Sequence, residues 1–120
     1  MRVFKKDTVP KEPRKAPLFT GTVFIQSFIG PDVSQRFMIG EIHFEKSVRN
    51  KFHKHATEQV LIVTAGKGIV ATEKEEVPVI PGDIIFIPAE EIHWHGAAPS
   101  FTFSHIAISS PGSETTQTEE

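Results

Sequence analysis

The chain contains no cysteine and no tyrosine, and it has no long apolar run among its 120 residues. Without cysteine there is neither a disulfide nor a thiolate metal site, so any metal ion must be held by imidazole, carboxylate or amide groups. Nothing in the chain predicts a membrane-spanning helix, and the basic N-terminus lacks the apolar centre of a signal peptide. We therefore expect a cytoplasmic protein with no membrane partner.

A strong charge of either sign is absent as well. Thirteen Lys and Arg residues nearly balance fifteen Asp and Glu residues, for a formal net charge of -2. This balance gives no electrostatic reason to expect binding to nucleic acid or to an anionic membrane. A chain of this length suits one domain with a buried core and is too short for two.

Sustained helical periodicity is a third absence, because no stretch repeats its apolar residues every 3.6 positions. Short apolar or alternating stretches, separated by Gly- and Pro-containing turns, predict strands instead. The predicted strands are residues 22–28, 37–44, 60–64, 69–72, 77–80, 84–87 and 101–108. Many short strands at regular spacing predict an all-β fold, a sandwich or a barrel.

The two ends of the chain differ from this middle part. Residues 1–17 hold three prolines among basic residues and are predicted to form an N-terminal arm. Residues 111–120 are polar and acidic and are predicted to form a flexible tail. The single domain is therefore expected to span residues 18–110.

Four of the six histidines occur as two pairs, His53 with His55 and His93 with His95. Side chains two residues apart in a strand point to the same face. If this alternation continues beyond His55, Gln59 shares the face of the pair and Glu58 does not. A single pair of this kind is as often two ordinary surface or core histidines as it is a functional site. Two pairs attached to apolar strands favour a metal centre, because imidazole binds Mn, Fe, Co, Ni, Cu and Zn.

The spacing around these pairs resembles two sequence motifs of the cupin superfamily. The segment His53-x-His55-x3-Gln59-x6-Gly66 is similar to G-x5-H-x-H-x3,4-E-x6-G, and Gly82-x5-Pro88-x4-His93 is similar to G-x5-P-x-G-x2-H-x3-N. The resemblance covers residues 19–108 and implies a small antiparallel jelly-roll barrel. It also implies that one divalent transition-metal ion per chain is bound by His53, His55, Gln59 and His93. Manganese is the expected ion, and iron, zinc, nickel, cobalt and copper stay open.

The chain departs from the motifs at four positions. Ser47 and Glu90 replace motif glycines, and Ala97 replaces an asparagine, all at turn or packing positions. Gln59 replaces the usual glutamate. With "LIVTAGKG" at 61–68, "HWHGAAP" at 93–99 and "SHIAIS" at 104–109, this glutamine is similar to the small single-domain cupins that include bacterial manganese-dependent hydroxynitrile lyases.

Several further residues have a functional and a structural interpretation. His95 shares the face of His93 but is outside the ligand set of the resembled family, so we predict a catalytic acid or base, with a packed histidine as the alternative. The predicted substrate-pocket residues are Gly40, Ile42, Phe44, Leu61 and His105, with core packing as their alternative. His43 falls on the polar side of its predicted strand and is expected at the surface.

These observations favour an enzyme that acts on a small organic molecule at the metal. The resemblance implies a hydroxynitrile-lyase-like reaction at a C–C bond. The alternatives are a dioxygenase that cleaves an aromatic or alkene substrate and a non-catalytic cupin that binds a small molecule. Apolar residues on both sides of the strand at 60–63 indicate that both of its faces are covered, so we also expect a homodimer.

Overall fold

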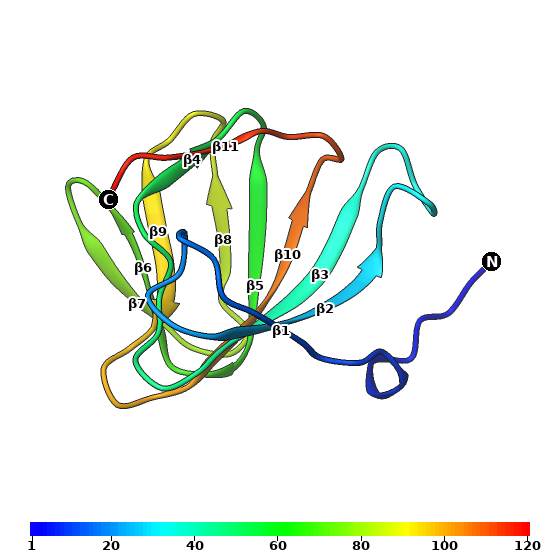
Figure 1. Ribbon diagram of the computed structural model, residues 1–120, viewed down its shortest axis with the longest axis horizontal. Helices are drawn as coiled ribbons and strands as arrows, with labels where there is room; N and C mark the ends of the chain where they lie inside the picture. Colours follow the sequence, from blue (N-terminus) through cyan, green and yellow to red (C-terminus); the bar gives the residue numbers. More distant parts are fainter.

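The fold consists of two antiparallel sheets that face each other, described by a computed structural model for residues 1–120 (Figure 1). One short 3-10 helix, η1 (Lys6–Thr8), precedes eleven strands. They are β1 (Glu12–Arg14), β2 (Val23–Ile29), β3 (Met38–Phe44), β4 (His53–His55), β5 (Gln59–Gly66), β6 (Gly68–Thr72), β7 (Glu76–Val79), β8 (Ile84–Ile87), β9 (His93–Ala97), β10 (Phe103–Ser109) and β11 (Thr115–Gln117). The predicted all-β class is confirmed.

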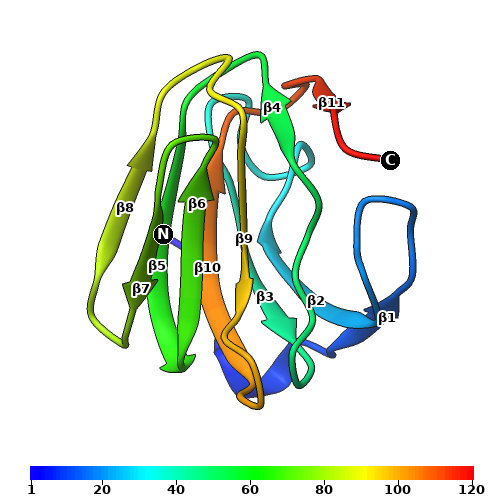
Figure 2. The ribbon, with the colours of Figure 1, turned by 90° about the vertical axis from the view of Figure 1, so that its left-hand side faces the viewer.

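The two sheets divide the strands in the interleaved manner of a jelly-roll barrel. One sheet has the order β1-β2-β3-β10-β5-β8 and the other has the order β11-β4-β9-β6-β7. The chain crosses repeatedly from one sheet to the other, so strands close in sequence often lie in opposite sheets (Figure 2). No helix in the structure has the length and apolar character needed to cross a membrane.

The seven strands predicted from apolar patterning all occur, with ends within two residues of the prediction. The two histidine pairs lie on β4 and β9. The expectation of a flexible tail is corrected for its later residues, because β11 pairs with β4 through Thr115, Thr116 and Gln117. Composition indicated disorder there, but an edge strand gains its backbone hydrogen bonds from a distant partner that composition does not reveal. The boundary drawn at residue 110 stays a prediction.

The N-terminal arm is fixed to the outer face of the larger sheet. Its strand β1 pairs with β2, and Gln26 Nε2 donates hydrogen bonds to the carbonyl oxygens of Lys6 and Val9. Lys6 Nζ lies 2.7 Å from the buried carboxylate of Glu41. His43, expected at the surface, is only partly exposed, and its ring lies 2.7 Å from both Ser104 Oγ and Gln26 Oε1.

The hydrophobic core lies between the two sheets and follows the alternation of their strands. One cluster joins Val23, Phe44, Val63, Val79, Ala97 and Phe103, and a smaller one joins Leu61, Ile87 and Ala107. Phe44 and Phe103 pack with ring centroids 5.9 Å apart. Phe44 also contacts the rings of His95 and His105, so the core continues directly into the buried histidines.

The four glycine positions of the two motifs share one backbone conformation. Gly66 and Gly82 have φ of 75° and 95°, and Ser47 and Glu90, which replace the other two glycines, have φ of 64° and 68°. This left-handed conformation is unfavourable for residues that carry a Cβ atom. The motif glycines thus allow a left-handed backbone conformation at the turns. Ser47 and Glu90 keep this conformation although they carry a Cβ atom.

Candidate metal centre

Three histidines meet where β4 lies beside β9. His53 on β4 is the registered partner of His93 on β9, and their ring centroids are 4.3 Å apart. The ring of His55 lies 4.9 Å from that of His53 and 5.5 Å from that of His93. One ligand nitrogen from each of the three rings lies within 4.8 Å of the others. The two short strands therefore bring together three imidazoles that could hold one metal ion.

Each ring is oriented by a hydrogen bond at its Nδ1 atom. His53 Nδ1 donates to the carbonyl oxygen of Lys51 at 2.6 Å, and His93 Nδ1 donates to that of Glu91 at 2.8 Å. His55 Nδ1 lies 2.9 Å from the hydroxyl of Thr115. An imidazole that carries its proton on Nδ1 has a free lone pair on Nε2. Such contacts to the far nitrogen are typical of histidines that bind metal ions.

Two ring nitrogens of the cluster lack partners. His55 Nε2 and His93 Nε2 are buried and make no hydrogen bond, and Gln59 Oε1 is also buried without a partner. A buried polar atom without a partner costs about 1–3 kcal/mol, so the two nitrogens in one cluster need an explanation. Both are lone-pair donors in the tautomers described, and a cation held by the rings would satisfy them together. The residues present therefore fit a divalent transition-metal ion.

The electrostatics of the cluster keep the rings neutral. Burial lowers the pKa of His53 to about 3, with a further contribution from His93. Burial and the neighbouring His93 also lower the pKa of His55. Burial lowers the pKa of His93, although contacts with Glu91 oppose the shift. A neutral imidazole is the form that binds a metal ion, so the site is ready for a ligand role near neutral pH.

Gln59 belongs to a different sheet from the three histidines. It is the first residue of β5, whereas β4 ends at His55, so the alternation assumed from residue 53 to residue 63 does not run along one continuous strand. Glu58 is exposed, and Gln59 Oε1 is buried. Strand alternation therefore does not place Gln59 beside the histidines, and its role as a ligand stays a prediction.

His95 lies behind the cluster. Its ring stacks 5.7 Å from that of His93 and lies edge-on to that of His53, with centroids 5.8 Å apart. It is 3% exposed, and burial, followed by the neighbouring His105, lowers its pKa well below the ordinary value. Its Nδ1 lies 3.0 Å from His105 Nε2, and Asn50 Nδ2 lies 3.2 Å from its Nε2. The three-histidine cluster does not include His95, and its catalytic role stays a prediction.

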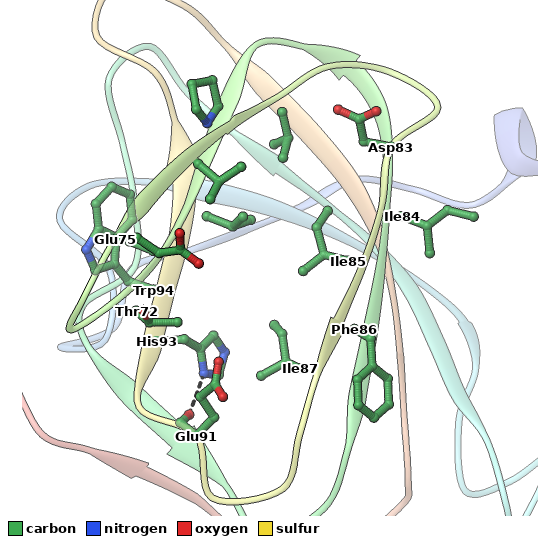
Figure 3. A pocket seen from close by; sticks show the side chains of 15 residues that line it. Thr72, Glu75, Asp83, Ile84, Ile85, Phe86, Ile87, Glu91, His93 and Trp94 are labelled. Atoms are coloured by element: carbon green, nitrogen blue, oxygen red, sulfur yellow. Dashed lines mark hydrogen bonds between the residues drawn. The ribbon is translucent and has the colours of Figure 1, made fainter.

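A cavity of about 460 Å³ opens between the two sheets and has His93 in its wall. Figure 3 shows Ile85, Ile87 and His93 turned toward it and Ile84 and Phe86 turned away. Hydrophobic residues make up most of its lining, and the acidic residues Glu75, Asp83 and Glu91 also line it. A small molecule in it would lie against one of the three histidines.

The predicted substrate-pocket residues lie elsewhere. None of Gly40, Ile42, Phe44, Leu61 and His105 lines the cavity beside His93. Phe44, Leu61 and His105 are almost fully buried, and Ile42 packs against both core clusters. Their contact with a substrate stays a prediction.

Four groups that contact the histidines of this region were not found by sequence reasoning. Thr115 lies 60 positions from His55 in a tail expected to be flexible, so no local pattern relates the two. Asn50 accepts a hydrogen bond from the backbone N–H of His95 at 2.8 Å, again from a distant segment. The carbonyl oxygens of Lys51 and Glu91 each precede their histidine by two residues, but a backbone oxygen leaves no trace in the sequence.

The structure is a jelly-roll barrel with three converging histidines that could hold a metal ion, and comparison with known proteins agrees with the fold. The Cupin domain family matches residues 40–103, so the chain belongs to the cupin family. It is 43% identical over 96 residues to a (R)-mandelonitrile lyase from Granulicella tundricola, an alignment that covers 78% of this chain and 72% of that protein.

Solved structures show the same fold. A cupin-like protein from Thermotoga maritima superposes with a TM-score of 0.85 at 27% identity, covering 100% of this chain and 90% of the other. The polyketide cyclase RemF from Streptomyces resistomycificus gives a TM-score of 0.88 at 21% identity, covering 100% of this chain and 87% of the other. The second likeness concerns the fold alone.

Proposed function

We propose that the protein is a metal-dependent lyase that cleaves or forms the C–C bond of a cyanohydrin. The observation that carries the proposal is the cluster of His53, His55 and His93, with buried, unpartnered nitrogens on His55 and His93. The likeness to a (R)-mandelonitrile lyase suggests the reaction, since mandelonitrile is the cyanohydrin of an aromatic aldehyde. The proposed ion is manganese, with iron, zinc, nickel, cobalt and copper as alternatives.

The ligand set supports non-redox chemistry. A bound divalent ion would supply a Lewis acid that polarises the oxygen of the substrate. Three neutral imidazoles and one amide leave the double positive charge of such an ion uncompensated, which favours a substrate that is easily deprotonated. The replacement of the usual glutamate by Gln59 removes the one anionic ligand that would weaken this effect.

The chain's own residues supply binding and proton transfer. The apolar wall formed by Ile85 and Ile87 suits the hydrocarbon part of the substrate and excludes water from the reacting carbon. In the proposed cleavage, His95 accepts the hydroxyl proton, the C–O bond becomes a carbonyl, and the electron pair of the C–C bond leaves with cyanide. The proton then passes from His95 to cyanide, so the products are an aldehyde and hydrogen cyanide.

We also propose that a second copy of the chain covers the outer face of β10, β5 and β8 in the larger sheet, beside the part that the N-terminal arm contacts. Register aligns Ile84 with Ile62 and Ile106, and Phe86 with Val60 and Ile108. Ile84 and Phe86 are 70% and 58% exposed. Apolar rows on the outside of a sheet are typical of protein–protein contacts. A homodimer predicts that Phe86→Glu shifts the mass in light scattering from dimer to monomer, and a monomeric wild type would contradict it.

The lyase proposal is tested by metal analysis and by two assays on the loaded protein. We expect about one transition-metal ion per chain, and hydrogen cyanide and aldehyde in equal amounts from mandelonitrile without oxygen uptake. His53→Ala and His93→Ala should lose the metal and the activity together. Full metal content in both variants contradicts the proposed centre. Oxygen consumption matched to product would favour the dioxygenase, and tight substrate binding without turnover would favour a binding protein.

A further inference from the structure

The strand that carries two of the three histidines is held mainly by the C-terminal tail. β4 has one registered pair with β9, between His53 and His93, and three with β11. Figure 1 shows β11 alongside β4 near the C-terminus. A strand of three residues gains little from its own sequence, so its neighbours decide how firmly it is held. Of the two strands that pair with β4, β11 therefore makes the longer contact.

Contacts beyond the strand extend this support to both ends of β4. The backbone N–H of Ala56 donates to the carbonyl oxygen of Glu114 at 2.9 Å. At the other end, the Glu119 carboxylate accepts a hydrogen bond from the backbone N–H of Phe52 at 2.8 Å and from Arg49 Nη2 at 2.9 Å. Charge-assisted contacts of this kind fix geometry as well as position.

The tail also touches a histidine ring directly. Two of the three rings are oriented by carbonyl oxygens, which accept hydrogen bonds and therefore fix the proton on Nδ1. The ring of His55 is oriented instead by Thr115 Oγ1, at 2.9 Å from its Nδ1. In the tautomer that leaves His55 Nε2 free, the Nδ1–H donates to this hydroxyl. That tautomer matches the buried, unpartnered state of His55 Nε2.

We propose that Thr115 is a positioning residue for His55 and that β11 is part of the metal centre. This inference rests on the proposed metal-binding function. Thr115 touches neither substrate nor metal; it acts by holding the imidazole in one tautomer and one orientation. Removal of a group that supports a metal-binding histidine in this way weakens metal affinity by about 10- to 100-fold.

Three variants distinguish the effect of the Thr115 hydroxyl from the effect of β11 pairing with β4. Thr115→Val keeps the branched shape and the β-propensity of the side chain but removes the acceptor. Thr115→Ser restores the hydroxyl. Thr116→Val is the matched control, because Thr116 lies on the same strand, is exposed and makes no side-chain hydrogen bond. Thermal unfolding of the metal-free proteins checks that all three keep the fold.

The first measurement is Mn²⁺ affinity, with free Mn²⁺ followed by electron paramagnetic resonance. We expect Thr115→Val to bind at least about tenfold more weakly than the wild type, and Thr115→Ser and Thr116→Val to bind as the wild type does. Equal affinity in Thr115→Val and wild type would overturn the inference and leave the metal centre intact. A wild type that binds no Mn²⁺, Fe²⁺ or Zn²⁺ would overturn both.

The second measurement does not need a metal. The ¹⁵N chemical shifts of the histidine rings in the metal-free protein report which nitrogen carries the proton. We expect His55 to carry its proton on Nδ1 in the wild type and in Thr115→Ser, and to populate both tautomers in Thr115→Val. The same tautomer in all three proteins would show that Thr115 does not set it.

Discussion

His53 and His93 face each other across β4 and β9 as the one registered pair between those strands, with ring centroids 4.3 Å apart. Each donates its Nδ1–H to a carbonyl oxygen two residues earlier in its own segment. Two imidazoles with fixed tautomers thus approach from two strands that touch at a single point. The centre depends on this contact, because neither strand holds a complete ligand set.

The predicted ligand role of Gln59 is tested by substitutions at Gln59 and at its neighbour Glu58. Gln59→Ala should lower metal affinity by at least about tenfold, and Glu58→Ala, the matched control at an exposed position, should leave affinity unchanged. Gln59→Glu should keep or raise affinity, because it adds a negative charge beside the ion, and should lower non-redox activity for the same reason. Titration calorimetry and initial rates measure both. The reverse pattern, with metal lost in Glu58→Ala, would move the ligand by one residue.

The role of His95 is tested by truncation. His95→Ala should keep the metal, since the ring is outside the three-histidine cluster. Loss of a positioned acid or base should lower turnover by about 10²–10⁴-fold. The variant also leaves His105 and Asn50 without their partner, so unfolding should become easier by about 2 kcal/mol. Metal content, thermal stability and turnover are measured on the same protein. Loss of metal would make His95 a ligand, and unchanged turnover would make it a packing residue.

The buried histidines predict loss of stability in acid. Burial lowers the pKa of His105 from the ordinary value of 6.5 to about 4, so the unfolded chain binds a proton that the folded chain refuses. The free energy of unfolding of the metal-free protein should therefore decrease as the pH falls from about 6.5 toward 4. This one residue accounts for about 3 kcal/mol across that window. Urea unfolding at several pH values measures the slope, and NMR titration of the His105 ring gives its pKa. A ring that protonates near 6.5 in the folded protein would contradict the prediction.

The N-terminal arm predicts a separate effect on stability. Glu41 is fully buried, and its carboxylate receives hydrogen bonds from Lys6 Nζ at 3.0 Å and Thr64 Oγ1 at 2.6 Å. Burial alone would raise the pKa of Glu41, but these bonds and the charge of Lys6 lower it on balance. Lys6→Met removes the cation and should lower the free energy of unfolding by about 2 kcal/mol.

The control for the arm is Lys5→Met, because Lys5 is exposed and makes no ion pair. It should unfold as the wild type does. Because the pKa of Glu41 is lowered, the contribution of the carboxylate is present above its unfolded value near 4.5 and is lost as the pH falls below it. The difference between Lys6→Met and wild type should shrink over the same range. Equal stability of the two proteins at pH 7 would show that the arm contact adds nothing.

The strand pattern and three of the site residues could be predicted because they depend on local physics. Apolar alternation and Gly- or Pro-containing turns gave seven strands, since a strand that packs on one face must alternate. The same local reasoning was weaker for Gln59. Strand alternation from residue 53 to residue 63 predicted that Gln59 shares the face of the histidine pair. The structure has no continuous strand over these residues, because the chain crosses from one sheet to the other between β4 and β5.

By itself, the sequence determined the class of fold, the pairing of histidines on short strands and the turns at the motif glycine positions, because each follows from neighbours along the chain. Only the tertiary structure decided that Thr115 contacts His55, that Lys6 pairs with Glu41, and that His93 borders a cavity. These contacts join residues far apart in sequence through sheet register and the packing of two sheets. A short edge strand and a charged arm make few stabilising contacts within their own sequence. Their hydrogen bonds and ion pairs form with residues that only the folded barrel brings close.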